Sequence, residues 1–104
     1  MKYIINESKL ISFLDKVIED SVGKLEMEPL LDINAREDDF KLVNSNNETI
    51  FTYMDYELSV NKNLYYTLGN LFNLKEDELR NLIQKWFEKN YPGHLVIGVY
   101  YSPY

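Results

Sequence analysis

The feature that most constrains the fold is an alternation of apolar and polar residues between Phe40 and Val60. Two groups of turn-forming residues, Ser45–Asn47 and Asp55, interrupt this alternation. Alternation with a period of two indicates strands that have one buried face, and short turns join antiparallel neighbours. The region is therefore predicted to be a three-stranded antiparallel meander, with strands at Phe40–Asn44, Glu48–Met54 and Tyr56–Val60.

Three further segments carry apolar residues at every third or fourth position, which is typical of amphipathic helices. They span residues 7–22, 62–72 and 74–90. Each is preceded by an asparagine that can cap a helix: Asn6, Asn61 and Asn73. Asn73 and Glu76 are expected to form a capping-box-like start of the last helix. Phe13 in the first helix and Leu71 in the second are expected to face the core.

The remaining segments predict shorter strands. Lys2–Ile5 is predicted to be a first strand, and residues 24–29 an edge strand or an extended arm. Leu95–Tyr101 is predicted to be the last strand, and both of its faces are apolar. Such a strand is either central and covered on both sides, or an edge strand whose second face meets a partner. The predicted fold is a single α+β domain, with a small, mostly antiparallel sheet (the meander plus terminal strands) and three helices packed on it.

Composition narrows the function classes. The chain of 104 residues has a net charge of −6, and its only arginines are Arg36 and Arg80. A negative domain with few guanidinium groups is poorly suited to bind phosphate backbones or anionic membrane surfaces. The chain has no cysteine, which suits the cytoplasm of a cell. We therefore expect neither a direct nucleic-acid partner nor a membrane partner, and a cytoplasmic location.

The sequence offers little catalytic chemistry. His94 is the one histidine, and without cysteine it cannot complete a usual zinc site. It follows Pro92-Gly93, so a turn histidine at the entrance of a strand is the expected role. The acidic residues between Glu26 and Asp39 lack the ligand spacing of a calcium loop. The prediction is a protein that is not an enzyme and carries no metal and no cofactor.

Two groups of residues are candidates for binding another protein. No charged residue follows Lys89, and the uncharged segment is rich in tyrosine. Exposed tyrosines are favoured at interfaces because they combine apolar area with a hydroxyl group at low entropic cost. The first candidates are therefore Tyr100, Tyr101 and Tyr104. The second candidates are the carboxylates Glu37, Asp38 and Asp39, which could meet a basic surface.

Short motifs resemble those of small uncharacterised proteins of tailed phages and their hosts. The opening residues Tyr3–Leu10 resemble a strand-to-helix start in such proteins. The segments Leu74–Leu79 and Lys85–Glu88 look similar to the second half of some of them. The resemblance implies a phage accessory or virion-associated protein. It implies no activity that could be transferred.

Three functions follow as hypotheses. The first is a non-enzymatic interaction protein, such as a phage accessory component, that binds another protein or itself through its aromatic C-terminal segment. The second is an acidic inhibitor of a nucleic-acid-handling or defence complex, acting through Glu37–Asp39. The third is a regulator resembling a helix-turn-helix protein, with helices at 62–72 and 74–90. The third requires a recognition helix that begins Lys75-Glu76-Asp77-Glu78, where carboxylates would face DNA.

Overall fold

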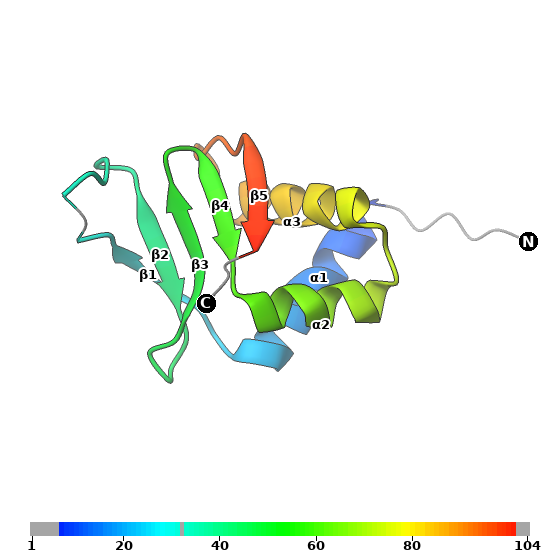
Figure 1. The fold of residues 1–104 in the computed structure, drawn as a ribbon. Coiled ribbons are helices and arrows are strands. Elements are labelled where there is room, and N and C mark those ends of the chain that lie inside the picture. Colours follow the sequence, from blue (N-terminus) through cyan, green and yellow to red (C-terminus); the bar gives the residue numbers. More distant parts are fainter. Residues whose placement is uncertain (1–6, 32, 102–104) are drawn as a thin grey trace, which may run out of the picture.

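A computed structural model describes residues 7–31 and 33–101 of the chain, without the side chains of residues 7 and 8. Its helices and strands follow the order expected from the sequence within this range (Figure 1). The elements are α1 (Glu7–Val22), β1 (Glu26–Pro29), β2 (Phe40–Val43), β3 (Thr49–Met54), β4 (Glu57–Val60), α2 (Lys62–Phe72), α3 (Glu76–Asn90) and β5 (Gly98–Tyr101). The predicted strand at Lys2–Ile5 lies outside the described residues.

The strands form one sheet in the order β1-β2-β3-β4-β5. The pairs from β1 to β4 are antiparallel, whereas β4 and β5 are parallel. The meander is therefore confirmed, and so is the predicted α+β class with a mostly antiparallel sheet. Two parallel neighbours need a long connection between them. Here α2 and α3 form that connection and return the chain to the end of the sheet at which β4 begins.

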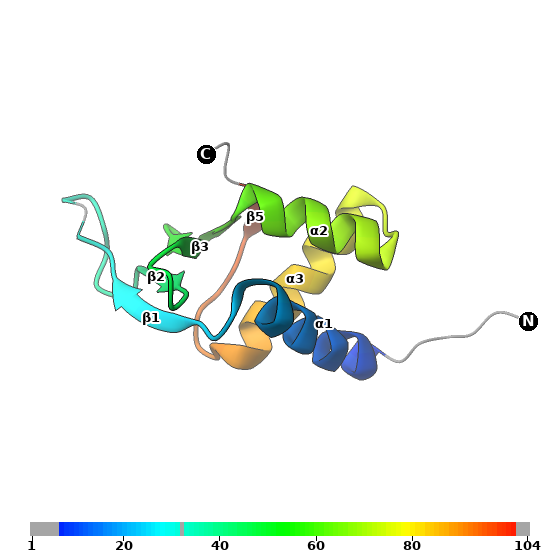
Figure 2. The ribbon, with the colours of Figure 1, turned by 90° about the horizontal axis from the view of Figure 1, so that it is seen from below.

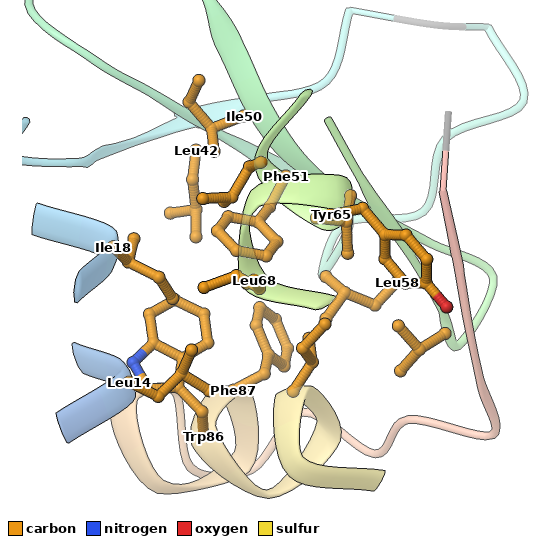
Figure 3. Packing of buried hydrophobic residues seen from close by; sticks show 14 of the residues in the cluster. Leu14, Ile18, Leu42, Ile50, Phe51, Leu58, Tyr65, Leu68, Trp86 and Phe87 are labelled. Carbon is orange, nitrogen blue, oxygen red and sulfur yellow. The ribbon is translucent and has the colours of Figure 1, made fainter. Parts of the chain in front are cut away.

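All three helices lie on one side of the sheet (Figures 1 and 2). Their apolar faces meet one face of the sheet in a continuous core, in which Phe51, Leu68 and Phe87 are almost completely buried (Figure 3). Phe51 stacks on Trp86 at 5.0 Å between ring centroids, and Phe40 stacks on Phe87 at 5.8 Å. Burial of aromatic and aliphatic side chains from every layer is what stabilises the arrangement of helices on sheet.

No helix of the described residues covers the other face of the sheet (Figures 1 and 2). The register places Lys41, Thr52, Ser59 and Tyr100 side by side across β2, β3, β4 and β5. The first three side chains are half-buried by their neighbours, and Tyr100 is exposed. The uncovered face is therefore polar over most of its width and becomes aromatic only at β5.

The last strand differs from its prediction. It begins at Gly98 rather than Leu95, and of the two predicted alternatives, a central or an edge strand, it is the edge strand. In a continuous strand Leu95 and Ile97 would share a face with the buried Val99, but both are exposed while Val96 is buried, so the strand does not extend back to Leu95. The reason is that residues 95–97 form a loop whose main chain is held by side chains of other elements.

The predicted positions of the three helices are confirmed. The boundary between α2 and α3 and the burial of two apolar side chains differ from the prediction. The Asn61 side chain caps α2 by accepting the Leu64 N–H at 3.1 Å. Asn73 does not cap α3: it ends α2 in the left-handed conformation, which asparagine tolerates, and α3 starts after Lys75. Phe13 and Leu71 are about half exposed rather than in the core.

Candidate functional site

The two edges of the sheet differ in how well they are protected. Strand β1 presents Glu26, Glu28 and Pro29 at one edge. Charged residues and proline on an edge strand discourage another strand from pairing with it. Strand β5 at the opposite edge, with the sequence Gly-Val-Tyr-Tyr, has neither a charge nor a proline. Among residues 7–31 and 33–101, no strand pairs with the outer edge of β5. This edge, called the free edge below, is therefore the part of the sheet best suited to accept a further strand.

The direction of the main-chain groups in β4 follows from the turn before it. Asp55 and Tyr56 both have positive φ, at 54° and 65°, in a two-residue hairpin turn. In such a turn the flanking residues, Met54 and Glu57, exchange hydrogen bonds with each other. Since main-chain groups alternate in direction along a strand, those of the next residue, Leu58, are directed away from β3 and toward β5.

The same alternation identifies the free groups of β5. Leu58 is in register with Val99. In a parallel ladder a residue bonds to the two residues that flank its partner, so Leu58 pairs with Gly98 and Tyr100. The N–H and C=O groups of Val99 and Tyr101 consequently point away from β4. These two residues supply the open hydrogen-bonding positions at the edge of the sheet.

Aromatic side chains surround this edge on both faces of β5. On the helical face, Tyr101 lies 5.2 Å from Tyr65 and 5.9 Å from Tyr66 of α2 between ring centroids. On the uncovered face, the ring of Tyr100 lies over Gly98, where an added Cβ atom would be only 2.7 Å from the tyrosine hydroxyl oxygen. Tyr66, Tyr100 and Tyr101 remain between 39% and 50% exposed. They offer apolar area to a partner without leaving their own packing.

A groove of about 260 Å³ lies between α3 and β5, lined by Asp77, Arg80, Asn81, Gln84, Gly98, Val99 and Tyr100. The Arg80 guanidinium donates to Glu76 Oε1 at 2.7 Å, and the hydroxyl of Tyr65 is 3.4 Å from the same oxygen. Burial raises the pKa of Tyr65 above its ordinary range, so this hydroxyl stays protonated. Arg80, one of the residues that line the groove, is thus held by Glu76 beside the free edge.

The loop that leads into β5 is held at two carbonyl groups. The Tyr53 hydroxyl donates to the Leu95 carbonyl at 2.7 Å, and Gln84 Nε2 donates to the Val96 carbonyl at 3.1 Å. Burial also raises the pKa of Tyr53, which keeps it a donor over the physiological range. A third bond joins the Ile97 N–H to the Tyr56 carbonyl at 2.8 Å. The edge strand is therefore presented in a fixed position.

The acidic candidates do not form one surface. Glu37 and Asp38 are exposed in the loop between β1 and β2, but Asp39 is only 5% exposed. Its two carboxylate oxygens accept the Arg36 N–H at 2.8 Å and the Asp55 N–H at 3.3 Å. Asp39 is thus an internal link between two loops, and its prediction as a contact for a basic partner is corrected.

The tyrosines and the exposed carboxylates also lie far apart, because β5 and β1 are the two outer strands. Tyr104 lies outside the described residues. The contribution of α3 to the groove had no signal in the sequence, since Arg80 and Gln84 belong to an ordinary polar helix face. Tyr66 could have been suspected from its position beside Tyr65, where two successive helix residues cannot both face the core.

Other features of the described chain have structural roles. His94 lies in a turn, with Nδ1 3.1 Å from the Tyr91 carbonyl oxygen and its ring edge-on to Phe40 at 5.0 Å. A hollow of about 280 Å³ beside Trp86 is lined partly by Asp15, which accepts the indole N–H at 3.1 Å. Within residues 7–31 and 33–101, no cluster of acidic or histidine side chains could hold a metal ion. In the same range, no helix is long and apolar enough to cross a membrane.

Comparison of the chain with protein-family models, with curated proteins and with solved structures finds no match. The candidate site therefore stands on its own geometry: a free edge strand, exposed tyrosines on either side of it, and a groove along α3.

Proposed function

We propose that this domain is a non-enzymatic protein-binding module that takes up an extended segment of its partner at the free edge of β5. The observation that carries the proposal is the contrast between the two edges of one sheet. The β1 edge has charges and a proline that discourage pairing, whereas β5 has none. Main-chain hydrogen bonds to Val99 and Tyr101 would supply affinity, as in other cases of strand addition.

The side chains beside the edge support a partner with apolar residues. An added strand would place alternate side chains against Tyr100 on one face and against Tyr66 and Tyr101 on the other. Neither β5 nor the loop from Leu95 onward carries a charge, and the two charged residues that line the adjacent groove, Asp77 and Arg80, have opposite signs. The preferred partner segment is therefore short, extended and rich in apolar or aromatic residues.

The test uses the full chain as bait and compares two substitutions of Tyr101. Tyr101→Pro removes an N–H that points away from β4, so the existing ladder keeps its bonds while an incoming strand is blocked. Tyr101→Thr removes the same ring but retains the N–H. We expect proteins captured by the wild-type chain to be lost with the proline variant and retained, more weakly, with the threonine variant. Equal capture by wild-type and proline chains would show that the edge is not the binding site.

The two alternative functions remain predictions. An inhibitor with an acidic surface would now have to act through Glu37 and Asp38 without Asp39. A helix-turn-helix regulator would have to bind DNA with the acidic first turn of α3. A phage accessory role, suggested by the sequence resemblance, is compatible with the proposed binding function and would be tested by identifying the captured partner.

A further inference from the structure

We infer that the strand added to β5 is β5 of a second copy, antiparallel and related by a twofold axis that passes beside Tyr100. The inference rests on the proposed function of the edge and names its occupant. A symmetric dimer uses the same patch on both copies, so the patch has to be complementary to itself. The hydrogen-bonding groups, the charge and the side chains of β5 each meet this requirement.

The hydrogen bonds select one register. With Tyr100 opposite its symmetry mate, Val99 lies opposite Tyr101 of the second copy, and both residues exchange their free N–H and C=O groups with each other. Centring the pair on Val99 would place Ile97 opposite Tyr101, but the Ile97 N–H already bonds to Tyr56. Centring it on Tyr101 would oppose Val99 with Pro103, which has no N–H. Only the Tyr100 register pairs both open residues fully.

The charge distribution allows two copies to approach at this edge. Each chain carries a net charge of −6, so most surfaces of one copy repel those of another. The segment after Lys89 has no charged residue, and the uncovered face beside β5 carries Ser59 and Thr52 rather than acidic groups in the row of Tyr100. The groove beside the edge adds one acidic and one basic residue, Asp77 and Arg80, whose charges have opposite signs. Two like-charged copies can therefore meet at the edge of β5 at little electrostatic cost.

The side chains add a contact at the axis. In the chosen register the two Tyr100 residues form a non-hydrogen-bonded pair, the closer of the two antiparallel arrangements, with both rings on the uncovered face. Tyr100 is 47% exposed, so part of its ring is accessible to a second copy. Tyr101, on the helical face, would stand beside Val99 of the other copy and extend the cluster that it forms with Tyr65 and Tyr66.

The area indicates a weak dimer. Tyr66, Ile97, Tyr100 and Tyr101 each expose between 39% and 67% of their surface. Since a fully buried aromatic side chain contributes about 150–250 Å², the exposed parts supply on the order of 100 Å² each. Two copies and their paired main chains then approach about 1,000 Å², the lower end for a specific interface. Contacts of this small size are typical of weak, transient association, so a dissociation constant in the micromolar range is expected.

The experiment is sedimentation equilibrium of the purified chain over concentrations that bracket this range, with charges placed on the axis. Tyr100→Lys and Tyr100→Asp each set like charges opposite one another and should weaken association by about tenfold. An equimolar mixture of the two variants sets opposite charges on the axis and should restore a dimer. Met27→Lys is the matched control, because Met27 is 53% exposed but lies on the β1 edge.

A covalent probe fixes the register independently. The chain has no cysteine, so Tyr100→Cys introduces a single thiol. In the proposed dimer two such residues form a non-hydrogen-bonded pair with Cα atoms about 4.5 Å apart, within reach of a disulfide. Mild oxidation should yield a disulfide-linked dimer that disappears under reduction. Met27→Cys, the matched control, should not cross-link under the same conditions.

Restored association in the mixture, together with the cross-link of the Tyr100→Cys variant, would support the inference. A wild-type chain that stays monomeric throughout would overturn it, as would a dimer that neither Tyr100 charge variant weakens. The proposed function fails separately. If the chain is monomeric but captures a foreign protein that the Tyr101→Pro variant loses, the edge binds that protein, and only the identity of its occupant was wrong.

Discussion

Asp39→Asn is the substitution that most directly tests the corrected view of the acidic segment. Asp39 is almost completely buried, and its carboxylate joins the loop after β1 to the turn before β4 through the N–H groups of Arg36 and Asp55. Asparagine has one side-chain oxygen and an NH₂ group that cannot accept. One of the two N–H groups would therefore lose its acceptor.

The cost can be worked out from the contacts. A hydrogen bond to a charged group contributes about 1.5–3 kcal/mol, and the bond to Asp55 at 3.3 Å is the weaker of the two. Asp39→Asn should accordingly lower the free energy of unfolding by about 2 kcal/mol. In a domain of this size that corresponds to a fall in Tm of about 10 °C. Asp38→Asn removes the same charge from the exposed neighbouring residue and should change stability by less than about 0.5 kcal/mol.

Urea unfolding followed by the fluorescence of Trp86 measures both variants. Trp86 is the only tryptophan and is 2% exposed, so its emission reports loss of the core. Equal m-values would show that the same surface is exposed on unfolding, which makes the midpoints comparable. Because the two variants have equal net charge, a difference between them cannot arise from overall electrostatics. Equal midpoints for the two variants would refute the structural role of Asp39.

Three further predictions concern the core, the pH dependence and the salt dependence. Gly69→Ala should raise the free energy of unfolding by about 1 kcal/mol, because alanine favours the helix over glycine by that amount. The added Cβ atom would meet Leu79 at 3.5 Å, which is an ordinary contact. A loss of stability would show that the packing of α2 needs the glycine. Tyr53→Phe should cost about 1 kcal/mol through the lost bond to Leu95. Because burial raises the Tyr53 pKa, its contribution is complete below the unfolded pKa of about 10 and is lost as the pH rises through the folded pKa. The variant should therefore lose stability less steeply than wild type as the pH rises above about 10, and parallel urea midpoints would contradict this. Self-association should tighten as salt rises from about 50 mM to about 500 mM, because screening reduces repulsion between copies of charge −6; weaker association in salt would point to ion pairs at the interface.

Most of the fold could be predicted because its signals are local. The meander follows from alternation and turn residues, and α1 spans the residues that its apolar period indicated. The boundary between α2 and α3 was missed because asparagine serves equally well before a helix and in the left-handed residue that ends one. Only the geometry of the short connection shows that Asn73 ends α2 and Lys75 precedes α3.

The site was harder to predict because it depends on pairing between distant segments. The apolar residues after Leu95 suit a central strand as well as an edge strand, and nothing in them specifies that β5 runs parallel to β4. The same holds for Asp39, which lies in a run of acidic residues and differs from Asp38 only in its folded neighbours. Its position three residues after Arg36, whose N–H it accepts, is the one local feature compatible with a side-chain-closed turn.

The proposed binding function would explain why the edge of β5 is unprotected while the same sheet protects its other edge. A chain that places Glu26, Glu28 and Pro29 on β1 already has the means to keep a strand from pairing. Strand β5 has neither charges nor a proline, yet the loop that precedes it is held by hydrogen bonds from Tyr53 and Gln84. An edge that is held rigid before it meets a partner loses less conformational entropy on binding, so a short strand can still give measurable affinity. Gln84→Ala removes the bond to the Val96 carbonyl and leaves the sequence of β5 unchanged. It should therefore weaken association at the edge. An unchanged dissociation constant would show that the fixed loop contributes nothing to binding.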